Sequence, residues 1–296
     1  MPDRVTPAIS EWVAAAPDQR QRELRQAIHT ILVAVSDLRN SGLEIVMKGG
    51  ILLAVGYEGD RYTRDIDFST SRSVEEVAPE KYSQSLSAAL AVAVDGLPYG
   101  LDCRVQQVKL EPPGSDKHFQ TLRMTVGFAP LTDVRRHSRL SQLQAVDIVS
   151  VDISYNEVIT ASEMLKIGEG TDVLASTLAD LVAEKYRAMI QQPIRKRIRR
   201  QDAYDIYHLL QSEADELEKT RATVLNALQR KAQARAVPVS STSLADPEVK
   251  KASHEEYALL QAEVARPLPD FETLYDAVRE YYEELGWLTA PPPVSS

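Results

Sequence analysis

Residues 44–68 read EIVMKGGILLAVGYEGDRYTRDIDF, and this stretch decides the fold that the sequence predicts. Its first four residues favour a strand, and the apolar run that begins at Ile51 predicts a short buried helix. The Gly-Gly pair between them suits the junction of a strand and a helix. The last four residues, which begin at Asp65, predict a second strand. The stretch therefore predicts two strands with a buried helix between them.

Two carboxylates in this stretch are candidates for chemistry. Asp65 and Asp67 flank Ile66, and residues two apart in a strand project to the same side. Carboxylates that close repel each other unless a cation lies between them, and their hard oxygen atoms suit Mg²⁺. An isolated Asp-x-Asp is more often a solvated strand end, so the interpretation depends on the neighbouring motifs.

Two neighbours favour the metal interpretation. Lys48-Gly49-Gly50 lies where a strand meets a helix, and without Cβ atoms the backbone N–H groups there can approach a polyphosphate. Asp152 lies opposite the buried side of a strand predicted over residues 149–153, where a third carboxylate could join the first two. Taken alone, the glycines are equally a turn and Asp152 is equally an exposed strand residue.

Periodicity outside this stretch predicts two domains. We expect a helix over residues 18–40 that ends near Gly42, a helix over 74–94, and strands over 122–128 and 149–153. From about residue 156 helical spacing takes over, which predicts an α+β core over 1–155 and a helical domain over 156–296. The predicted helices of this second domain are 177–191, 199–211, 213–234 and 271–286, with a loop over 238–247 and a frayed tail from 290.

Lys185 is an anomaly on the helix predicted from residue 177. It lies near the centre of an apolar stripe formed by Leu178, Leu181, Val182 and Met189. A lysine there either extends its charged end to solvent or meets an anion, such as a nucleotide phosphate. Asp202 lies on the apolar face of the next predicted helix and Asp205 at its edge, so Lys185 is an economical partner for both. Compensation of the helix dipole is the alternative role for the two acids.

Composition excludes several classes of protein. The chain has 296 residues, of which 44% are hydrophobic, so it can fill a core and is not disordered throughout. With 34 basic against 43 acidic residues the net charge is −9, which argues against coating long nucleic acids. One cysteine and the absence of an apolar stretch of membrane-spanning length predict a cytoplasmic protein. Two local basic clusters remain, Arg195–Arg200 and Arg135–Arg139.

Familiar catalytic motifs are absent. The sequence has no P-loop, no Gly-x-Gly-x-x-Gly fingerprint, no nucleophile elbow and no histidines at metal-ligand spacing. A cation-dependent reaction on phosphates is the chemistry that remains.

Five motifs in order carry a resemblance. They are Lys48-Gly-Gly-Ile-Leu-Leu-Ala54, Arg61-Tyr-Thr-Arg-Asp-Ile-Asp-Phe68, Val151-Asp-Ile-Ser154, Glu184-Lys-Tyr-Arg-Ala188 and Arg200-Gln-Asp-Ala-Tyr-Asp-Ile206. Over roughly residues 45 to 210 this set resembles the AbiEii/AbiGii nucleotidyltransferase toxin family, which includes the mycobacterial MenT toxins. The resemblance implies a DNA polymerase β-like nucleotidyltransferase core, a helical domain that completes the active-site cleft, and the toxin half of a type IV-like toxin–antitoxin pair with a cognate antitoxin.

The resemblance also implies roles for individual residues. Asp65, Asp67 and Asp152 would be the metal carboxylates for Mg²⁺, or for Mn²⁺ in its place, and Lys185 with Asp202 would complete the catalytic set. The nucleotide-binding set implied is Lys48, Gly49, Gly50, Thr63, Lys185 and Asp205. Gly49-Gly50 stands where many nucleotidyltransferases have Gly-Ser, so a serine contact to phosphate is missing.

The implied reaction transfers a nucleoside monophosphate from a nucleoside triphosphate to an acceptor. The 3′ end of tRNA is the first candidate, with Arg195, Lys196, Arg197, Arg199 and Arg200 as the residues that hold RNA. A protein hydroxyl, a small-molecule acceptor and a non-catalytic nucleotide- or antitoxin-binding module are the alternatives.

Overall fold

The computed structural model describes residues 9–114, 117–168 and 170–287. The chain divides into two compact units, Met1–Ser176 (unit 1) and Thr177–Ser296 (unit 2). No helix among the described residues is long and apolar enough to cross a membrane.

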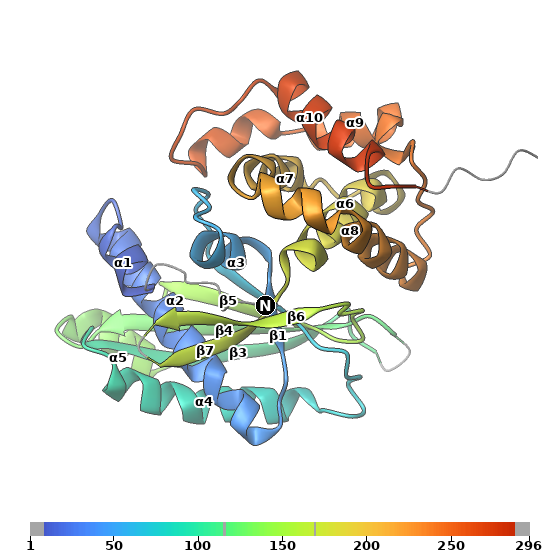
Figure 1. Ribbon diagram of the computed structural model, residues 1–296. Helices are drawn as coiled ribbons and strands as arrows, with labels where there is room; N and C mark the ends of the chain where they lie inside the picture. The colour runs from blue at the N-terminus through green and yellow to red at the C-terminus, as the bar shows by residue number, and fades with distance from the viewer. Residues whose placement is uncertain (1–8, 115–116, 169, 288–296) are drawn as a thin grey trace, which may run out of the picture. The chain divides into compact units, whose positions relative to one another are not determined.

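Unit 1 is built on a seven-stranded mixed sheet with the order β3-β4-β5-β2-β1-β7-β6 (Figure 1). The strands are β1 (Val46–Lys48), β2 (Asp65–Ser69), β3 (Leu101–Glu111), β4 (Thr121–Pro130), β5 (Ile148–Ser154), β6 (Ser162–Gly168) and β7 (Thr171–Ser176). β2 pairs with β5 and β1 pairs with β7 in parallel, whereas the other neighbours are antiparallel. The central strands therefore come from segments far apart in the sequence.

Helices flank this sheet. They are α1 (Ile9–Ala14), α2 (Gln19–Leu38), the 3₁₀ helix η1 (Arg39–Ser41), α3 (Gly49–Gly56), α4 (Pro79–Gly96) and α5 (Val134–Ser141). α2 begins where the side chain of Asp18 accepts a hydrogen bond from the backbone N–H of Gln21, and the helical segment stops at Gly42, whose φ of +71° is left-handed. α2 and α4 lie side by side below the sheet in Figure 1, where they cover one face of it.

Strand alternation places the core on that covered face. Ile66 and Phe68 of β2 and Val151 of β5 are fully buried, whereas Asp67 and Asp152 beside them are partly exposed. The prediction that Asp65 and Asp67 share one side of their strand, opposite Ile66 and Phe68, agrees with this burial pattern. The carboxylates thus lie on the other face of the sheet.

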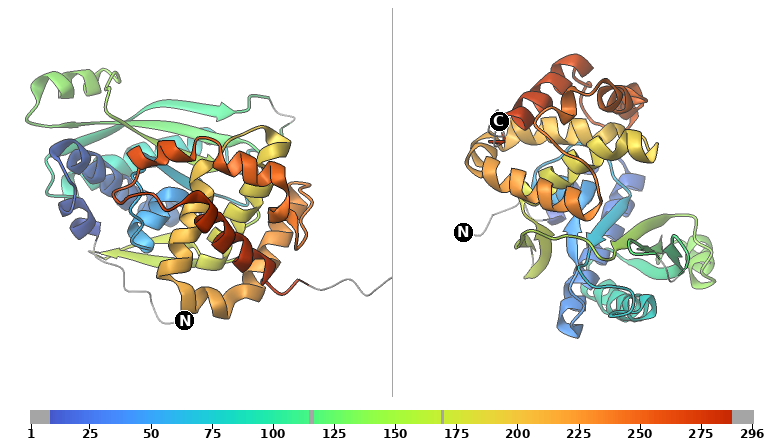
Figure 2. Two further views of the ribbon diagram at one scale, coloured as in Figure 1. Left: turned by 90° about the horizontal axis from the view of Figure 1, so that it is seen from above. Right: turned by 90° about the vertical axis from the view of Figure 1, so that its right-hand side faces the viewer.

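The regular elements described in unit 2 are helices (Figure 2). They are α6 (Leu178–Arg195), α7 (Arg200–Ser212), α8 (Ala214–Ala234), η2 (Ser243–Ala245), α9 (Pro247–His254), η3 (Tyr257–Ala262) and α10 (Phe271–Glu283). α6 packs against α7, α8 and α9, and α7 packs against α10. The four predicted helices of this half match α6, α7, α8 and α10 to within a few residues at their ends.

Several elements differ from the prediction. Strand structure does not cease near residue 156, because β6 and β7 add a hairpin to the sheet, and the division between units falls after Ser176 rather than after residue 155. The buried positions of that hairpin, such as Leu165, Ile167 and Val173, form an alternation too short to separate from a loop. α1, α5, β3 and α9 were also not predicted. The predicted tail from residue 290 lies outside the described residues.

Candidate functional site

A row of charged side chains crosses four neighbouring strands of unit 1. Lys48 of β1 is in register with Asp67 of β2, Asp67 with Asp152 of β5, and Asp152 with Arg123 of β4. Residues in register on neighbouring strands project from the same face of a sheet. The row therefore places two carboxylates between two cations.

Asp65 lies one pleat away, on the same face as this row. Asp65 is exposed as a whole residue, yet the pKa of its carboxyl is raised. The larger cause is partial removal of the carboxyl from water, and the smaller is repulsion from Asp67 and Asp152. Arg123 and Arg61 oppose that rise through their positive charges. The three acids singled out in the sequence are therefore close enough to act on one another electrostatically.

Arg123 holds the third acid. Its Nη2 lies 2.8 Å from Oδ2 of Asp152, and its Nε donates to both oxygens of that carboxylate at 3.1 and 3.2 Å. Hydrogen bonding to Asp152 raises the pKa of Arg123, whose Nη1 also lies 3.1 Å from Oε2 of Glu111. The hydroxyl of Ser150 donates to Asp152 at 3.0 Å. The carboxylate of Asp152 is thus held by protein donors.

The start of α3 lies close to the side chain of Asp67. A Cβ added to Gly49 would lie 2.5 Å from Oδ2 of Asp67, and the φ of Gly49 is +72°, so any other residue there would be strained. A Cβ on Gly50 would lie 2.9 Å from Nη2 of Arg61 and 3.2 Å from the hydroxyl of Thr63. Both glycines therefore allow the start of the helix to approach the side chains of Asp67, Arg61 and Thr63 closely, and the predicted approach to a polyphosphate stays a prediction.

Lys48 and Thr63 lie next to the start of α3 and the carboxylates of β2. The ammonium group of Lys48 lies 3.8 Å from a carboxylate oxygen of Glu157, and the hydroxyl of Thr63 donates to the backbone carbonyl of Asp65 at 3.3 Å. Positive charge and helix N–H groups next to paired carboxylates form surroundings that suit a metal-bound phosphate.

The residues present fit a divalent cation in part. Asp65 and Asp67 supply hard oxygen atoms from one side of one strand, and their mutual repulsion is relieved by a cation. Asp152 is engaged by Arg123, and within the described residues no three Asp, Glu, His or Cys side chains form a group that could hold a metal ion. Asp65 and Asp67 are the residues that would hold the ion, whereas the carboxylate of Asp152 is bonded to Arg123.

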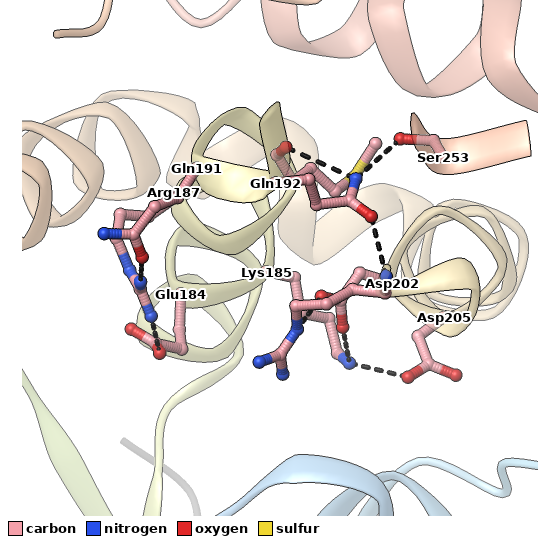
Figure 3. A network of polar contacts seen from close by, with 10 residues as sticks. Glu184, Lys185, Arg187, Gln191, Gln192, Asp202, Asp205 and Ser253 are labelled. Carbon is pink, nitrogen blue, oxygen red and sulfur yellow. Dashed lines mark hydrogen bonds and ion pairs between the residues drawn. The ribbon is translucent and has the colours of Figure 1, made fainter. Parts of the chain in front are cut away.

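Lys185 is buried in unit 2 and faces two carboxylates of α7 (Figure 3). Its ammonium group lies 2.6 Å from Oδ2 of Asp205 and 3.4 Å from Oδ1 of Asp202, and both acids are 2% exposed. Nε of Arg199 lies 2.7 Å from the other oxygen of Asp202. The predicted pairing of Lys185 with the two acids is confirmed, and the charges compensate one another inside unit 2. Contact between Lys185 and a nucleotide stays a prediction.

Glu184 and Arg187 of the same helix were not nominated. Figure 3 shows Arg187 on α6 bonded to Glu184 and Gln191, and its side chain is buried. Gln192 ties the start of α7 to α9, because its side chain accepts from the backbone N–H of Arg199 at 2.7 Å and donates to the hydroxyl of Ser253 at 2.9 Å. The partners of Gln192 come from other elements, so sequence patterns could not find it, whereas Arg187 has its partners three and four residues away on α6, a spacing that the sequence does contain.

The predicted RNA-binding cluster divides into two sets. Arg195, Lys196 and Arg197 are exposed where α6 ends. Arg199 pairs with Asp202, whereas Arg200 lies 3.0 Å from Glu256 and 2.6 Å from Glu263. The charges of these last two arginines are therefore compensated within unit 2, which weakens their assignment to RNA.

Arg61 and Arg123 were also missed. Arg123 occupies a polar position between the buried Leu122 and Met124, a pattern that marks it as facing away from the core. Nothing in that pattern states which acid it meets, because the register between β4 and β5 is a tertiary property.

Solved structures share the fold. One is JHP933 from Helicobacter pylori, with a TM-score of 0.52 and 12% identity over 92% of this chain and 93% of that one. Another is a protein from H. pylori described as a candidate nucleotidyltransferase, with a TM-score of 0.54 and 13% identity over 90% of this chain and 95% of that one. No curated protein matches the chain significantly.

The sequence itself matches a family model over residues 30–283, which include the carboxylates of unit 1 and the Lys185 network of unit 2. That model describes the nucleotidyl transferase AbiEii toxin of type IV toxin–antitoxin systems. The chain therefore belongs to the AbiEii family of nucleotidyltransferase toxins.

Proposed function

We propose that this nucleotidyltransferase toxin uses a divalent cation to transfer a nucleoside monophosphate from a nucleoside triphosphate to the 3′ end of an RNA, with tRNA as the first candidate. The observation that carries the proposal is the row in which Asp67 and Asp152 are in register, with Asp65 on the same face and the start of α3 against Asp67. We propose a DNA polymerase β-like core for the same reason.

The reaction is an in-line displacement at phosphorus. The acceptor hydroxyl oxygen forms a bond to the α-phosphorus, the bond from that phosphorus to the bridging oxygen breaks, pyrophosphate leaves with the electron pair, and the hydroxyl proton passes to water. A divalent cation, when bound, supplies charge neutralisation on the phosphates and lowers the pKa of the attacking hydroxyl.

The protein residues bind and orient in this proposal. Asp65 and Asp67 would hold Mg²⁺ or Mn²⁺, while Lys48 and the N–H groups at the start of α3 attract the triphosphate. Gly49 and Gly50 let the phosphates approach the backbone, and Thr63 borders Gly50. Lys185 is proposed to neutralise nucleotide phosphate, with Asp202 and Asp205 fixing its position.

A labelling experiment tests the function. We expect purified protein with Mg²⁺ or Mn²⁺ and each α-labelled nucleoside triphosphate to label a small RNA from a total RNA mixture and to release pyrophosphate. Asp67→Asn should reduce labelling by at least about 10²-fold, because the loss of one metal carboxylate weakens both binding and charge neutralisation. Asp95→Asn, an exposed position on α4, is the matched control and should label as well as wild type.

Two outcomes would replace the proposal. If label appears on protein or on a small molecule, the acceptor is not RNA, but the proposed transfer of a nucleoside monophosphate is kept. The absence of pyrophosphate release with any acceptor would leave a module that only binds nucleotide or antitoxin.

A further inference from the structure

A pocket opens in unit 1 beside Asp65. Its volume is about 210 Å³, and its walls come from the start of α2, the residues around the start of β2, the end of β4, α5, and the residues around the start of β5. The side chains of Arg20, Arg64 and Arg136 line it together with Asp65 and Ser150. The pocket is therefore bounded by a proposed metal carboxylate and by arginines, and the acids Glu23 and Asp147 also line it.

A second pocket of about 60 Å³ adjoins the first. Both are lined by Phe128, Arg136, Val146 and Asp147, and the second adds Arg135 and Arg139 of α5. Residues four apart on a helix lie on the same face, so Arg135 and Arg139 extend the arginine lining in one direction away from Asp65. We call the two adjoining pockets the arginine groove.

Within the described part of the chain, one arginine of the groove forms ion pairs, whereas the others do not. Nη2 of Arg136 lies 2.8 Å from Glu23 and 2.9 Å from Asp147, so this arginine ties α5 to α2 and to the start of β5. Arg20, Arg64, Arg135 and Arg139 are exposed, and none of them forms an ion pair with another described residue. These positive charges stand out on a chain whose net charge is −9.

Apolar surface lies among these arginines. The side chains of Val146 and Ile148 are 69% and 45% exposed at the groove, whereas Phe128, which lines both pockets, is 4% exposed. Guanidinium groups beside apolar surface suit the phosphates and bases of a single strand. Because the aromatic ring is buried, we expect affinity to come from phosphate contacts rather than from stacking.

We propose that the arginine groove binds the backbone of single-stranded RNA whose 3′ end lies beside Asp65. The inference rests on the proposed function, because it assigns the groove to the acceptor of that reaction. It places the main contact with RNA on unit 1, rather than on the Arg195–Arg200 cluster of unit 2. The exposed guanidinium groups bind phosphates along the groove, and the small volume beside Asp65 admits the terminal nucleotide.

Salt-dependent binding tests the groove. The probe is a 5′-fluorescein oligouridylate of about 12 nucleotides, whose binding is followed by fluorescence anisotropy between about 50 and 200 mM salt. Arg135→Ser combined with Arg139→Ser should weaken binding about tenfold. The slope of log K against log salt should become shallower by about 1.4, which is about 0.7 for each lost phosphate contact on single strands.

A double variant elsewhere in unit 1 is the matched control. Arg22→Ser combined with Arg72→Ser removes the same charge from exposed positions that line neither pocket, and should bind within about twofold of wild type with an unchanged slope. Thermal melts confirm that both double variants fold. If the groove variant binds like the control, the inference is overturned, and an acidic protein becomes the occupant to test.

The two proposals can fail separately. Asp67→Asn should bind the probe as tightly as wild type while its labelling falls by at least about 10²-fold. If RNA binds through the groove but no label is transferred, the proposed function is overturned, while the groove remains an RNA-binding site. If the Arg135→Ser/Arg139→Ser variant transfers label to RNA as well as wild type does, the proposed function is kept and the assignment of the groove to RNA is overturned.

Discussion

Asp65 has a raised pKa because the carboxyl is partly removed from water and lies close to Asp67 and Asp152. The native state therefore binds a proton at higher pH than the unfolded chain does. As pH rises from 3.8, the ordinary pKa of an aspartate, through the raised pKa, ionisation of Asp65 costs stability. Below that window both states are protonated and the cost disappears.

Removing the carboxylate of Asp65 should therefore stabilise the native state at neutral pH. In a chelating buffer at neutral pH, Asp65→Asn should raise the melting temperature by about 1–2 °C, because it removes a repelled charge that solvent partly screens. The difference should vanish below about pH 3.8, and Asp95→Asn should show no rise. A lower melting temperature for Asp65→Asn at neutral pH would contradict the repulsion.

Arg123 is the second residue that the structure singles out. Its guanidinium group occupies the oxygens that Asp152 would offer to a cation. Arg123→Gln should therefore raise affinity for Mn²⁺ about tenfold, and it should lower the melting temperature without metal because three carboxylates then repel one another.

Calorimetric titration with Mn²⁺ measures the first effect, and thermal melts with and without Mn²⁺ measure the second. Arg104→Gln is the control, since Arg104 is an exposed arginine of β3 that pairs with Asp102. Weaker Mn²⁺ binding by Arg123→Gln would show that Arg123 organises the carboxylates instead of competing for them.

At the scale of elements, α3 depends on a residue without Cβ at its start. Gly49→Ala would place a methyl group 2.5 Å from Oδ2 of Asp67 at a φ of +72°. We expect this variant to lose about 1–3 kcal/mol of stability and most nucleotide affinity, because Asp67 must move away. Gly96→Ala, at the end of α4 with open space around it, is the control. Thermal melts and binding of a fluorescent nucleoside triphosphate distinguish the two.

The pair α6 and α7 depends on a buried ionic network. Lys185→Met leaves the carboxylate of Asp205 without its lysine and should cost about 3–5 kcal/mol in urea denaturation. Adding Asp205→Leu should recover part of the loss because it removes the second charge. Lys219→Met on α8 changes an exposed lysine and should cost little. A Lys185→Met protein as stable as wild type would show that the network carries little stability.

At the scale of the whole molecule, net charge limits how the chain meets RNA. A net charge of −9 repels a polyanion except at local basic surface. We expect an RNA of about 40 nucleotides to bind within about threefold of one of about 12 nucleotides, because contacts end with the groove. Competition anisotropy measures the ratio. A much tighter long RNA would indicate a continuous basic path.

The sequence predicted a considerable part of this architecture. The helix over 18–40, the buried helix after Gly50, the strands around Asp67 and Asp152 and most helices of unit 2 follow from apolar periodicity, which depends only on local spacing. The hairpin of β6 and β7 was missed because its alternation is short. β3 was missed as well, and much of its length is exposed, so its burial pattern carries little periodic signal.

By itself the sequence determined which side of each strand its acids face and which buried lysine needs anionic partners. Its residues 30–283 also match the AbiEii family model. Only the tertiary structure decided that Asp152 lies beside Asp67, that Arg123 holds it, and that arginines from α2, β2 and α5 line one groove. The reason is physical: side-chain direction follows from local backbone period, whereas strand register and the meeting of distant segments depend on packing of the whole core.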